Sequence, residues 1–338
     1  MRKKLRFIGF IALGYFAIHL GIAPSGDFAI SSAYGPGAVP VEMDRPFTFA
    51  VLGDTHAFRG NMRAVALDAA TRGCRFVIQL GDFVDYDDAF EYRDFAYRLN
   101  PESLPIPVHL TRGNHETMAT VGGFSDNFAR HVVPTYRIFE FGGALFCMLD
   151  NSDGQFAPPQ LTTCDERIRA FREQRPDGAV LLFMHMPPGT ADRSSPDLLE
   201  SESMRLRLFT QRWKPAAIFA GHVHDHYETA LGDTRVIVSG CGGGSLRAPS
   251  TDTHYLEVTI DGGRAGVESI PFEGEGRAIA TLRYAVNVLA LRYRRQCLAA
   301  TLLLAIVWGL RARRRARSAP RVDSAGTRPD SLPRDEFA

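Results

Sequence analysis

Cysteine and tryptophan are scarce in this sequence of 338 residues, which has five Cys and two Trp. No two cysteines are spaced as Cys-x-x-Cys, so the sequence has no paired-cysteine motif for metal binding or redox chemistry. Internal repeats are absent too, which excludes a repeat architecture. Cys297 falls within an apolar segment, and the other four cysteines could pair in an oxidising compartment or remain free buried thiols; these are Cys74, Cys147, Cys164 and Cys241.

A strong excess of charge of one sign is also missing, since the formal net charge is +1. The distribution of charge is nevertheless uneven, because residues 1–6 hold four Lys or Arg and residues 283–338 hold twelve Arg. Residues 7–282 have 23 basic and 34 acidic side chains, a net charge of −11. This acidic body has no basic stripe for a nucleic-acid backbone, so we expect no nucleic-acid partner.

Five short motifs rich in metal-binding side chains follow one another along the chain. They are Gly53-Asp54-Thr55-His56, Gly81-Asp82-Phe83-Val84-Asp85, Gly113-Asn114-His115-Glu116, the lone His185, and Gly221-His222-Val223-His224. Together they supply enough oxygen and imidazole donors for two metal ions. Carboxylate, amide and imidazole donors suit Mn²⁺, Fe or Zn²⁺ better than ions that seek soft thiolates.

Each motif directly follows a short apolar segment rich in β-forming residues. These segments are 47–53, 75–81, 108–113, 180–184 and 216–221, and their composition is typical of strands covered on both faces. Between the first two, the apolar residues Met62, Val65, Ala66 and Ala69 predict a covering helix over 61–72. Because ligands at the carboxyl ends of neighbouring strands meet at one rim of a sheet, we expect the motifs to converge.

This set of donors indicates a reaction type. Two divalent cations about 3.5 to 4 Å apart can turn a shared water into hydroxide and bind both oxygens of an in-line phosphoryl displacement. Alternation along an extended turn places Asp54 and His56 on the same side, so that both can reach one ion. The glycine-rich stretch 239–245 fits two roles: a nest of backbone N–H groups near a phosphate, or a tight loop that closes the sheet.

In order and spacing, the five motifs resemble those of the calcineurin-like metallophosphoesterase superfamily, over residues 46 to 272. The resemblance implies an α/β fold: a four-layer α/β/β/α sandwich, with two mixed sheets face to face, helices outside and a dinuclear site on one rim. It implies that one metal is bound by Asp54, His56 and His224, the other by Asn114, His185 and His222, and that Asp82 bridges both.

The resemblance also implies catalytic roles for His115 and Asp85. His115 would donate a proton to the leaving oxygen or stabilise charge on the phosphoryl group, and Asp85 would hydrogen-bond to that imidazole and orient it. Ala57 and Tyr86 depart from the motifs of the protein Ser/Thr phosphatases, and Asp85 stands where purple acid phosphatases have a Tyr ligand. The chain is most similar to the bacterial phosphodiesterase-like branch.

These residues predict a dinuclear metal-dependent hydrolase that cleaves phosphomonoesters or phosphodiesters by a metal-bridging hydroxide. The expected substrate is a small-molecule or lipid-linked phosphoester. The alternative is a membrane-tethered binding scaffold with the same fold and no turnover; scaffold members of the superfamily tend to lose ligands, and none is missing here. The sequence leaves the oligomeric state open.

Both ends of the chain have an apolar segment beside basic residues. Residues 7–23 are mostly apolar, follow a basic cluster and reach the lower limit of a spanning helix, so residues 1–25 are predicted to be a signal peptide or signal anchor. The fourteen apolar residues 297–310 would cover about 21 Å as a helix, which crosses a bilayer only if the flanking Arg side chains snorkel or the bilayer thins. We expect 278–312 to form a helix with a membrane anchor; the competing interpretation is a helix lying on the membrane or packed on the body.

The two basic clusters place both termini in the cytoplasm and the acidic body outside. This predicts a protein of the bacterial inner membrane with its catalytic domain facing the periplasm, or a secreted or periplasmic protein if the leader is cleaved. The remaining organisation is a linker over 26–45, a metallophosphoesterase domain over 46–275, and a basic disordered tail over 313–338, where Pro, Ser, Arg and Asp occur without periodicity.

Overall fold

The computed structural model describes residues 30–31, 33–34, 46–56, 58–99, 104–118, 126–195, 197–244, 253–282 and 284, and, near the C-terminus, residues 299, 302–303 and 306–311. The predicted leader over 1–25, most of the linker and the tail over 313–338 lie outside these residues. The chain divides into two compact units, and the larger one, Ile22–Arg292, contains all five motifs.

The helix expected over 278–312 is described only in part. Residues 277–282, 302–303 and 306–311 are helical, and the remainder of the predicted anchor falls outside the described residues. In the portion of the chain that the structure describes, no helix combines the length and the apolar character needed to cross a membrane.

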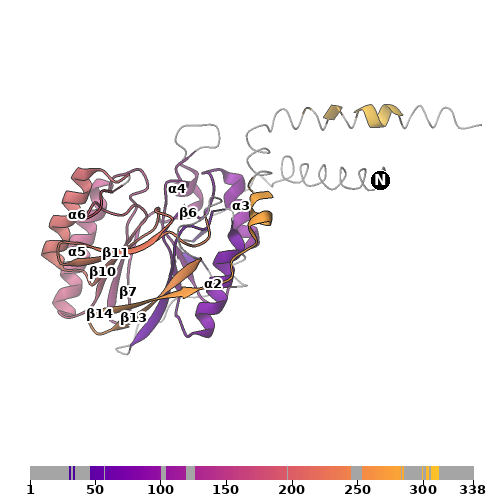
Figure 1. Ribbon diagram of the computed structural model, residues 1–338. Coiled ribbons are helices and arrows are strands. Elements are labelled where there is room, and N and C mark those ends of the chain that lie inside the picture. The colour runs from indigo at the N-terminus through magenta and orange to yellow at the C-terminus, as the bar shows by residue number, and fades with distance from the viewer. Residues whose placement is uncertain are drawn as a thin grey trace, which may run out of the picture. The chain divides into compact units, whose positions relative to one another are not determined.

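Two six-stranded sheets form the centre of the larger unit (Figure 1). The first has the strand order β14-β13-β3-β4-β5-β2, made by Arg264–Pro271, His254–Asp261, Phe47–Leu52, Val77–Gln79, Val108–Leu110 and Ala33–Tyr34. The second has the order β11-β12-β10-β9-β8-β7, made by His226–Leu231, Thr234–Ser239, Ala217–Ala220, Val180–Met184, Ala144–Met148 and Arg137–Phe141. A separate two-stranded sheet pairs β1 (Ile30–Ser31) with β6 (Val132–Val133).

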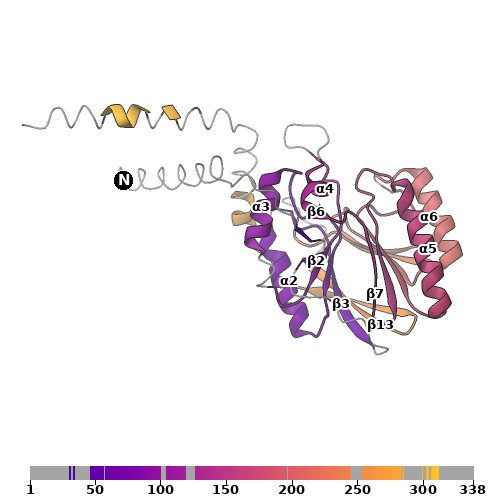
Figure 2. The same ribbon diagram turned by 180° about the vertical axis from the view of Figure 1, so that it is seen from behind.

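Helices cover the outer face of each sheet. Figures 1 and 2 show α2 and α3 on the outside of the first sheet and α5 and α6 on the outside of the second. The helices are α2 (Arg59–Thr71), α3 (Ala89–Arg98), α4 (Asn127–His131), α5 (Pro158–Gln174) and α6 (Glu200–Trp213). Two mixed sheets flanked by helices confirm the predicted α/β/β/α layering, and α2 is the helix expected over 61–72.

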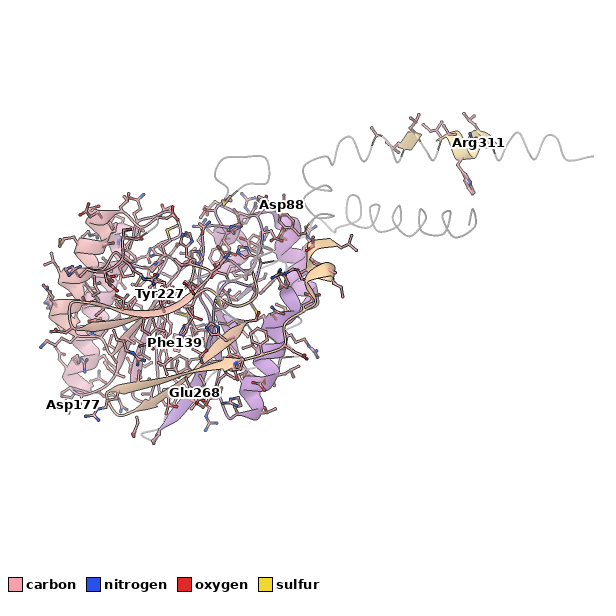
Figure 3. The ribbon with its side chains drawn as sticks, viewed as in Figure 1. Asp88, Phe139, Asp177, Tyr227, Glu268 and Arg311 are labelled. Atoms are coloured by element: carbon pink, nitrogen blue, oxygen red, sulfur yellow. The ribbon has the colours of Figure 1, made fainter. Side chains whose placement is uncertain are left out.

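Strand β3 illustrates how the sequence builds these layers. Phe49 and Val51 point into the core between the two sheets, whereas Ala50 and Leu52 point into the core beneath α2 and α3. Successive side chains of a strand face opposite sides of the sheet, so a strand covered on both faces is apolar throughout. Phenylalanines fill much of the inner core; Phe139, labelled in Figure 3, stacks on Phe146 with ring centroids 4.9 Å apart.

The strands that precede the motifs run in common directions. Strands β3, β4 and β5 are parallel to one another, as are β9 and β10, so within each sheet the carboxyl ends lie at the same edge. All five strands expected before the motifs are present. Of the two alternatives for the cysteines, the structure has thiols: the four described cysteines, which are Cys74, Cys147, Cys164 and Cys241, are buried and form no disulfide.

Candidate metal centre

The motifs meet at the rim formed by these carboxyl ends. In Figure 3, Asp88, which follows the second motif, lies at the upper edge of the body and Asp177, before β9, lies at the lower edge. Three groups of possible ligands gather at the motif rim, each with its ligand atoms within 4.8 Å of one another: Asp54, His56 and His224; His56, Asp82 and His115; and Asp82, His185 and His222. The first group has the same residues as the first predicted ligand set, and the third joins His185 and His222 of the second set to Asp82.

The first cluster is built around Asp54, whose carboxylate is fully buried. Its Oδ1 accepts a hydrogen bond from the main-chain N–H of His222 at 3.0 Å. Its Oδ2 is buried without a hydrogen-bond partner and lies 3.2 Å from Nε2 of His224. An ionised oxygen that is buried without a donor is costly, and a cation held with His56 and His224 would satisfy it.

In the second cluster, polar atoms of several side chains converge on one point. Oδ1 of Asn114 lies 2.9 Å from Nε2 of His185 and 2.9 Å from Nδ1 of His222. Nδ1 of His185 donates to the carbonyl oxygen of Leu80 at 2.9 Å, so Nε2 is the ring nitrogen that faces the cluster. An amide oxygen and two imidazole nitrogens that converge in this way form a donor set that suits a bound cation.

Asp82 lies between the two clusters. Its Oδ1 accepts a hydrogen bond from the main-chain N–H of His115 at 2.9 Å, which links Asp82 to the loop of the third motif. Its Oδ2 is 3.6 Å from Nε2 of His56, in the first cluster, and 3.4 Å from Nε2 of His185, in the second. Asp82 is therefore within reach of both clusters.

The electrostatics of the rim favour bound positive charge. Burial alone would raise the pKa of Asp82, but His185 and His115 bring it well below its ordinary value. Burial alone would lower the pKa of His185, but the charge of Asp82 and its hydrogen bond raise it to about 10. In the same way, His224 and His185 outweigh burial and lower the pKa of Asp54. The carboxylates therefore stay ionised in the interior and attract protons or metal ions.

Three of the predicted ligands adopt a backbone conformation that side chains other than glycine rarely take. The structure describes four non-glycine residues with positive φ, and His56 (44°), Asp82 (55°) and His222 (67°) are three of them. Such backbone strain concentrates at functional sites, where the surrounding structure must hold it.

Glu116 holds two of the ligand loops together. Its fully buried carboxylate accepts main-chain N–H groups of Asp82, Phe83, Val84 and Gly113 at 2.7 to 3.0 Å. Burial and the charge of Asp82 raise the pKa of Glu116 to about 7, while these N–H donors act in the opposite direction. The sequence placed Glu116 inside a motif, yet only the structure shows that it joins the second motif to the third.

The glycine-rich stretch packs tightly behind the ligands. The N–H of Gly244 donates to the carbonyl oxygen of Asp54 at 2.8 Å, and a Cβ atom added at Gly240 would come within 2.2 Å of the carbonyl oxygen of Val223. Glycine is needed at Gly240 because main chains approach so closely there. Of the two roles considered for this stretch, its described part fits the tight loop.

His115 and Asp85 lie beside the clusters, but their contact differs from the expectation. Nδ1 of His115 donates to the main-chain carbonyl oxygen of Asp85 at 2.7 Å, whereas we expected the carboxylate to be the acceptor. The side chain of Asp85 points toward His56, with Oδ1 4.0 Å from Nδ1 of that residue. Glu91 accepts the main-chain N–H of Asp85 at 2.9 Å in the bend after β4. The carbonyl group of Asp85 faces His115 in this bend. The main-chain carbonyl of Asp85, and not its carboxylate, therefore fixes the tautomer of His115.

The site also contacts a carboxylate, that of Asp197, which the sequence analysis did not single out. Oδ2 of Asp197 lies 2.6 Å from Nε2 of His222. Asp197 belongs to the loop between β9 and α6 and is part of no motif, so its spacing in the sequence contains no indication of this contact.

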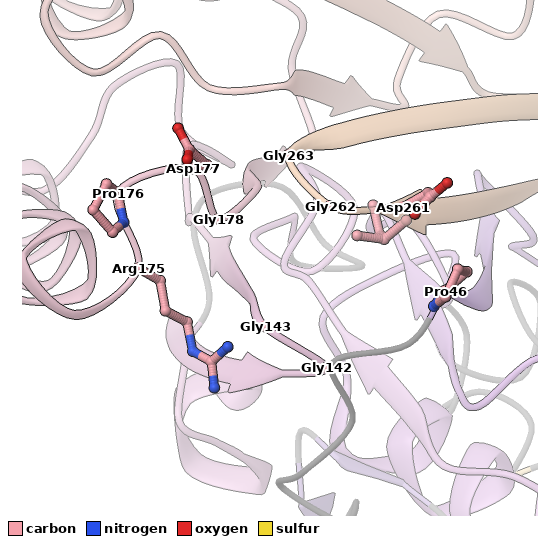
Figure 4. Close-up of a pocket in the computed structure, with 11 residues that line it drawn as sticks. Pro46, Gly142, Gly143, Arg175, Pro176, Asp177, Gly178, Asp261, Gly262 and Gly263 are labelled. Atoms are coloured by element: carbon pink, nitrogen blue, oxygen red, sulfur yellow. The ribbon is translucent and has the colours of Figure 1, made fainter.

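A hollow of about 330 Å³ has none of the predicted metal ligands in its lining, and Figure 4 shows the residues that do line it. It is lined by Pro46, by the turns at 142–143 and 261–263, and by 175–178, which precede strands β3, β8, β14 and β9. These segments belong to the rim opposite the motifs. Because its described lining brings no set of metal-binding side chains together, we place the functional site at the motif rim.

The family model described as calcineurin-like phosphoesterase matches residues 47–226, more than half of the chain. A protein of Fibrobacter succinogenes described as a probable cyclic nucleotide phosphodiesterase is 29% identical over 140 residues, which are 40% of this chain and 52% of that protein. The chain thus spans about half the length of this relative.

Solved structures with a similar course of the chain include two phosphatases. A purple acid phosphatase from yellow lupin (Lupinus luteus) is 15% identical, covering 68% of this chain and 51% of its own, with a TM-score of 0.49. A dimetal phosphatase from Danio rerio is 15% identical, covering 67% of this chain and 99% of its own, with a TM-score of 0.47. The match to the family model confirms the predicted family, and the chain belongs to the calcineurin-like phosphoesterases.

Proposed function

We propose that the protein is a divalent-metal-dependent phosphoesterase whose two clusters hold two cations that share Asp82. The observation that supports this most directly is the convergence of side chains from five strand ends on one rim, where Asp54 gathers with His56 and His224, and Asp82 with His185 and His222. The oxygen and imidazole donors fit Mn²⁺, Fe or Zn²⁺.

Divalent cations bound here would lower the pKa of a coordinated water and neutralise charge on the phosphoryl oxygens. His115 is placed to handle the other end of the reaction. Because its Nδ1–H is donated to the carbonyl oxygen of Asp85, Nε2 is the nitrogen left for substrate, and it lies 3.9 Å from Oδ2 of Asp82. Protonated at Nε2, His115 can give that proton to the departing alcohol oxygen.

We further propose that the preferred substrates are phosphodiesters. Arg112, beside the third motif, is mostly buried and already has acidic partners in the protein. Its guanidinium nitrogens lie 3.2 Å from a carboxylate oxygen of Asp126 and 3.6 Å from one of Asp150, and its Cζ lies 5.3 Å from the centre of the Phe128 ring. Its charge is therefore compensated within the protein. In an acidic body, a diester with one negative charge meets less repulsion than a monoester with two. The relative described as a probable cyclic nucleotide phosphodiesterase supports the same preference.

A hydrolysis screen of the full-length protein tests this proposal. We expect activity with Mn²⁺ on bis(p-nitrophenyl) phosphate, with a kcat/KM roughly tenfold or more above that on p-nitrophenyl phosphate. A chelator should abolish the activity and added Mn²⁺ should restore it. Stoichiometric Mn²⁺ binding without hydrolysis of either ester, or of a wider panel of phosphoesters, would contradict the enzyme and favour the scaffold without turnover.

We also propose that the catalytic body faces the periplasm of a bacterial cell, with a lipid-linked phosphoester among its possible substrates. The basic clusters at both ends support this topology, as does the exposure, between 55% and 66%, of five apolar side chains near the C-terminus, which are Leu302, Leu303, Ile306, Trp308 and Leu310. An Asp177→Cys variant should react with a membrane-impermeant maleimide in intact bacteria whose outer membrane has been permeabilised. Labelling only after lysis would contradict this location.

A further inference from the structure

The imidazole of His222 contacts the second cluster with one ring nitrogen and Asp197, in the loop between β9 and α6, with the other. On one side its Nδ1 lies 2.9 Å from Oδ1 of Asn114 and 3.2 Å from Nε2 of His185. On the other side its Nε2 lies 2.6 Å from Oδ2 of Asp197. The side chain of His222 is 14% exposed and that of Asp197 is 56% exposed, so the contact closes the cluster toward solvent.

This short contact determines which nitrogen of His222 has the proton. A carboxylate can only accept, so an imidazole nitrogen 2.6 Å from it must be an N–H donor. In the neutral ring the lone pair is then on Nδ1, the atom that faces Asn114 and His185. The opposite tautomer would place a lone pair against the carboxylate and an N–H where a cation would bind.

The main chain around Asp197 is held firmly although its side chain is exposed. Leu198 is buried in the core beneath α5 and α6. The N–H of Leu199 donates to the carbonyl oxygen of Gly154 at 3.0 Å, in a turn where Gly154 has a φ of +85°. The same turn includes Asn151, whose Oδ1 accepts the N–H of His185 at 3.1 Å. Asp197 is thus next to residues that contact the turn that positions His185, another residue of this cluster.

We propose that Asp197 is a positioning residue for the second cation. It accepts the Nε2–H of His222 and so keeps Nδ1 directed at the point shared by Asn114, His185 and Asp82. Partners of this kind orient a ligating histidine and increase its basicity, and losing one commonly weakens metal binding about 10- to 100-fold. The inference rests on the proposed metal-dependent function and adds a residue from outside the motifs to it.

Titration of the metal-free, full-length protein with Mn²⁺ in a calorimeter tests the role of Asp197. We expect Asp197→Ala to weaken one of the two binding steps about 10- to 100-fold and to leave the other within about twofold. Asp197→Asn should weaken that binding step less than Asp197→Ala does, because the amide oxygen of asparagine can still accept the Nε2–H of His222. The matched control is Asp192→Asn, which removes the same charge from the same loop, where Asp192 accepts from Thr190 and Thr229; its titration should match that of the unmodified protein.

A second measurement separates positioning from a loss of folding. In the metal-free protein, the long-range ¹H–¹⁵N spectrum of the histidine side chains should show His222 as the Nε2–H tautomer. Asp197→Ala should lose that signature while the spectrum of the backbone amides stays that of a folded protein.

The outcomes distinguish this inference from the function on which it rests. If Asp82→Asn weakens Mn²⁺ binding and Asp197→Ala binds both ions like the unmodified protein, the role of Asp197 is overturned and the proposed function stands. If Asp82→Asn itself leaves Mn²⁺ binding unchanged, the proposed function is overturned, and the role of Asp197 falls with it.

Discussion

Replacing Asp82 with asparagine is expected to reduce phosphoester hydrolysis by on the order of 10³-fold or more, equivalent to about 4 kcal/mol, and to lower the bound metal. The oxygen Oδ2 of Asp82 lies between His56 of the first cluster and His185 of the second. A neutral amide supplies a weaker donor and removes the negative charge that both clusters share. The measurements are kcat and metal content after dialysis, on protein whose circular dichroism matches that of the unmodified chain.

The matched control for Asp82→Asn is Asp177→Asn. This substitution makes the same chemical change at the opposite rim (Figure 3), where Asp177 is exposed in the loop before β9, and it should leave both kcat and metal content unchanged. Full activity of a metal-replete Asp82→Asn protein would show that the rim does not work as a shared metal centre.

Replacing Glu116 with alanine is expected to lower the free energy of unfolding by about 3 kcal/mol or more, because each buried hydrogen-bonding group left without its partner costs about 1 to 3 kcal/mol. Four main-chain N–H groups that now donate to its carboxylate would be left without an acceptor in the interior. The loops of the second and third motifs would separate, so activity should fall as well. Urea unfolding followed by circular dichroism measures the effect on stability.

Two further variants make the expectation for Glu116 decisive. Glu116→Gln keeps the size of the side chain but turns an N–H₂ group toward N–H donors, so we expect a loss of about 1 to 3 kcal/mol even if the alanine variant does not fold. Glu268→Ala removes an exposed carboxylate from β14 and should change stability by less than about 0.5 kcal/mol. A Glu116→Gln protein as stable as the unmodified chain would contradict the role assigned to these hydrogen bonds.

Much of the fold could be predicted because its cause is local. The apolar runs before Asp54, Asp82, Asn114, His185 and His222 are typical of strands buried on both faces, and all five are strands in the structure. The metal-binding side chains come directly after these strands. Because parallel strands end at a common rim, the side chains that follow them lie at that rim. The motif residues were therefore expected to meet, and they do.

The contacts that orient those donors could not be predicted in the same way. The main-chain carbonyl that orients His115, the tautomer of His185 set by Leu80 over a separation of 105 residues, and the carboxylate of Asp197 beside His222 each depend on how two loops face one another. No spacing rule relates such partners.

The amino-acid sequence by itself therefore determined the strands, the covering helix α2, the family and the residues available to bind metal, because apolar periodicity and motif order are properties of neighbouring residues. Only the tertiary structure decided which nitrogen of each histidine faces the centre, that Glu116 ties two motifs together, and that Asp197 completes the surroundings of His222. Hydrogen bonds are short and directional, so these arrangements exist only once the packing of the two sheets has brought distant loops within about 3 Å of each other.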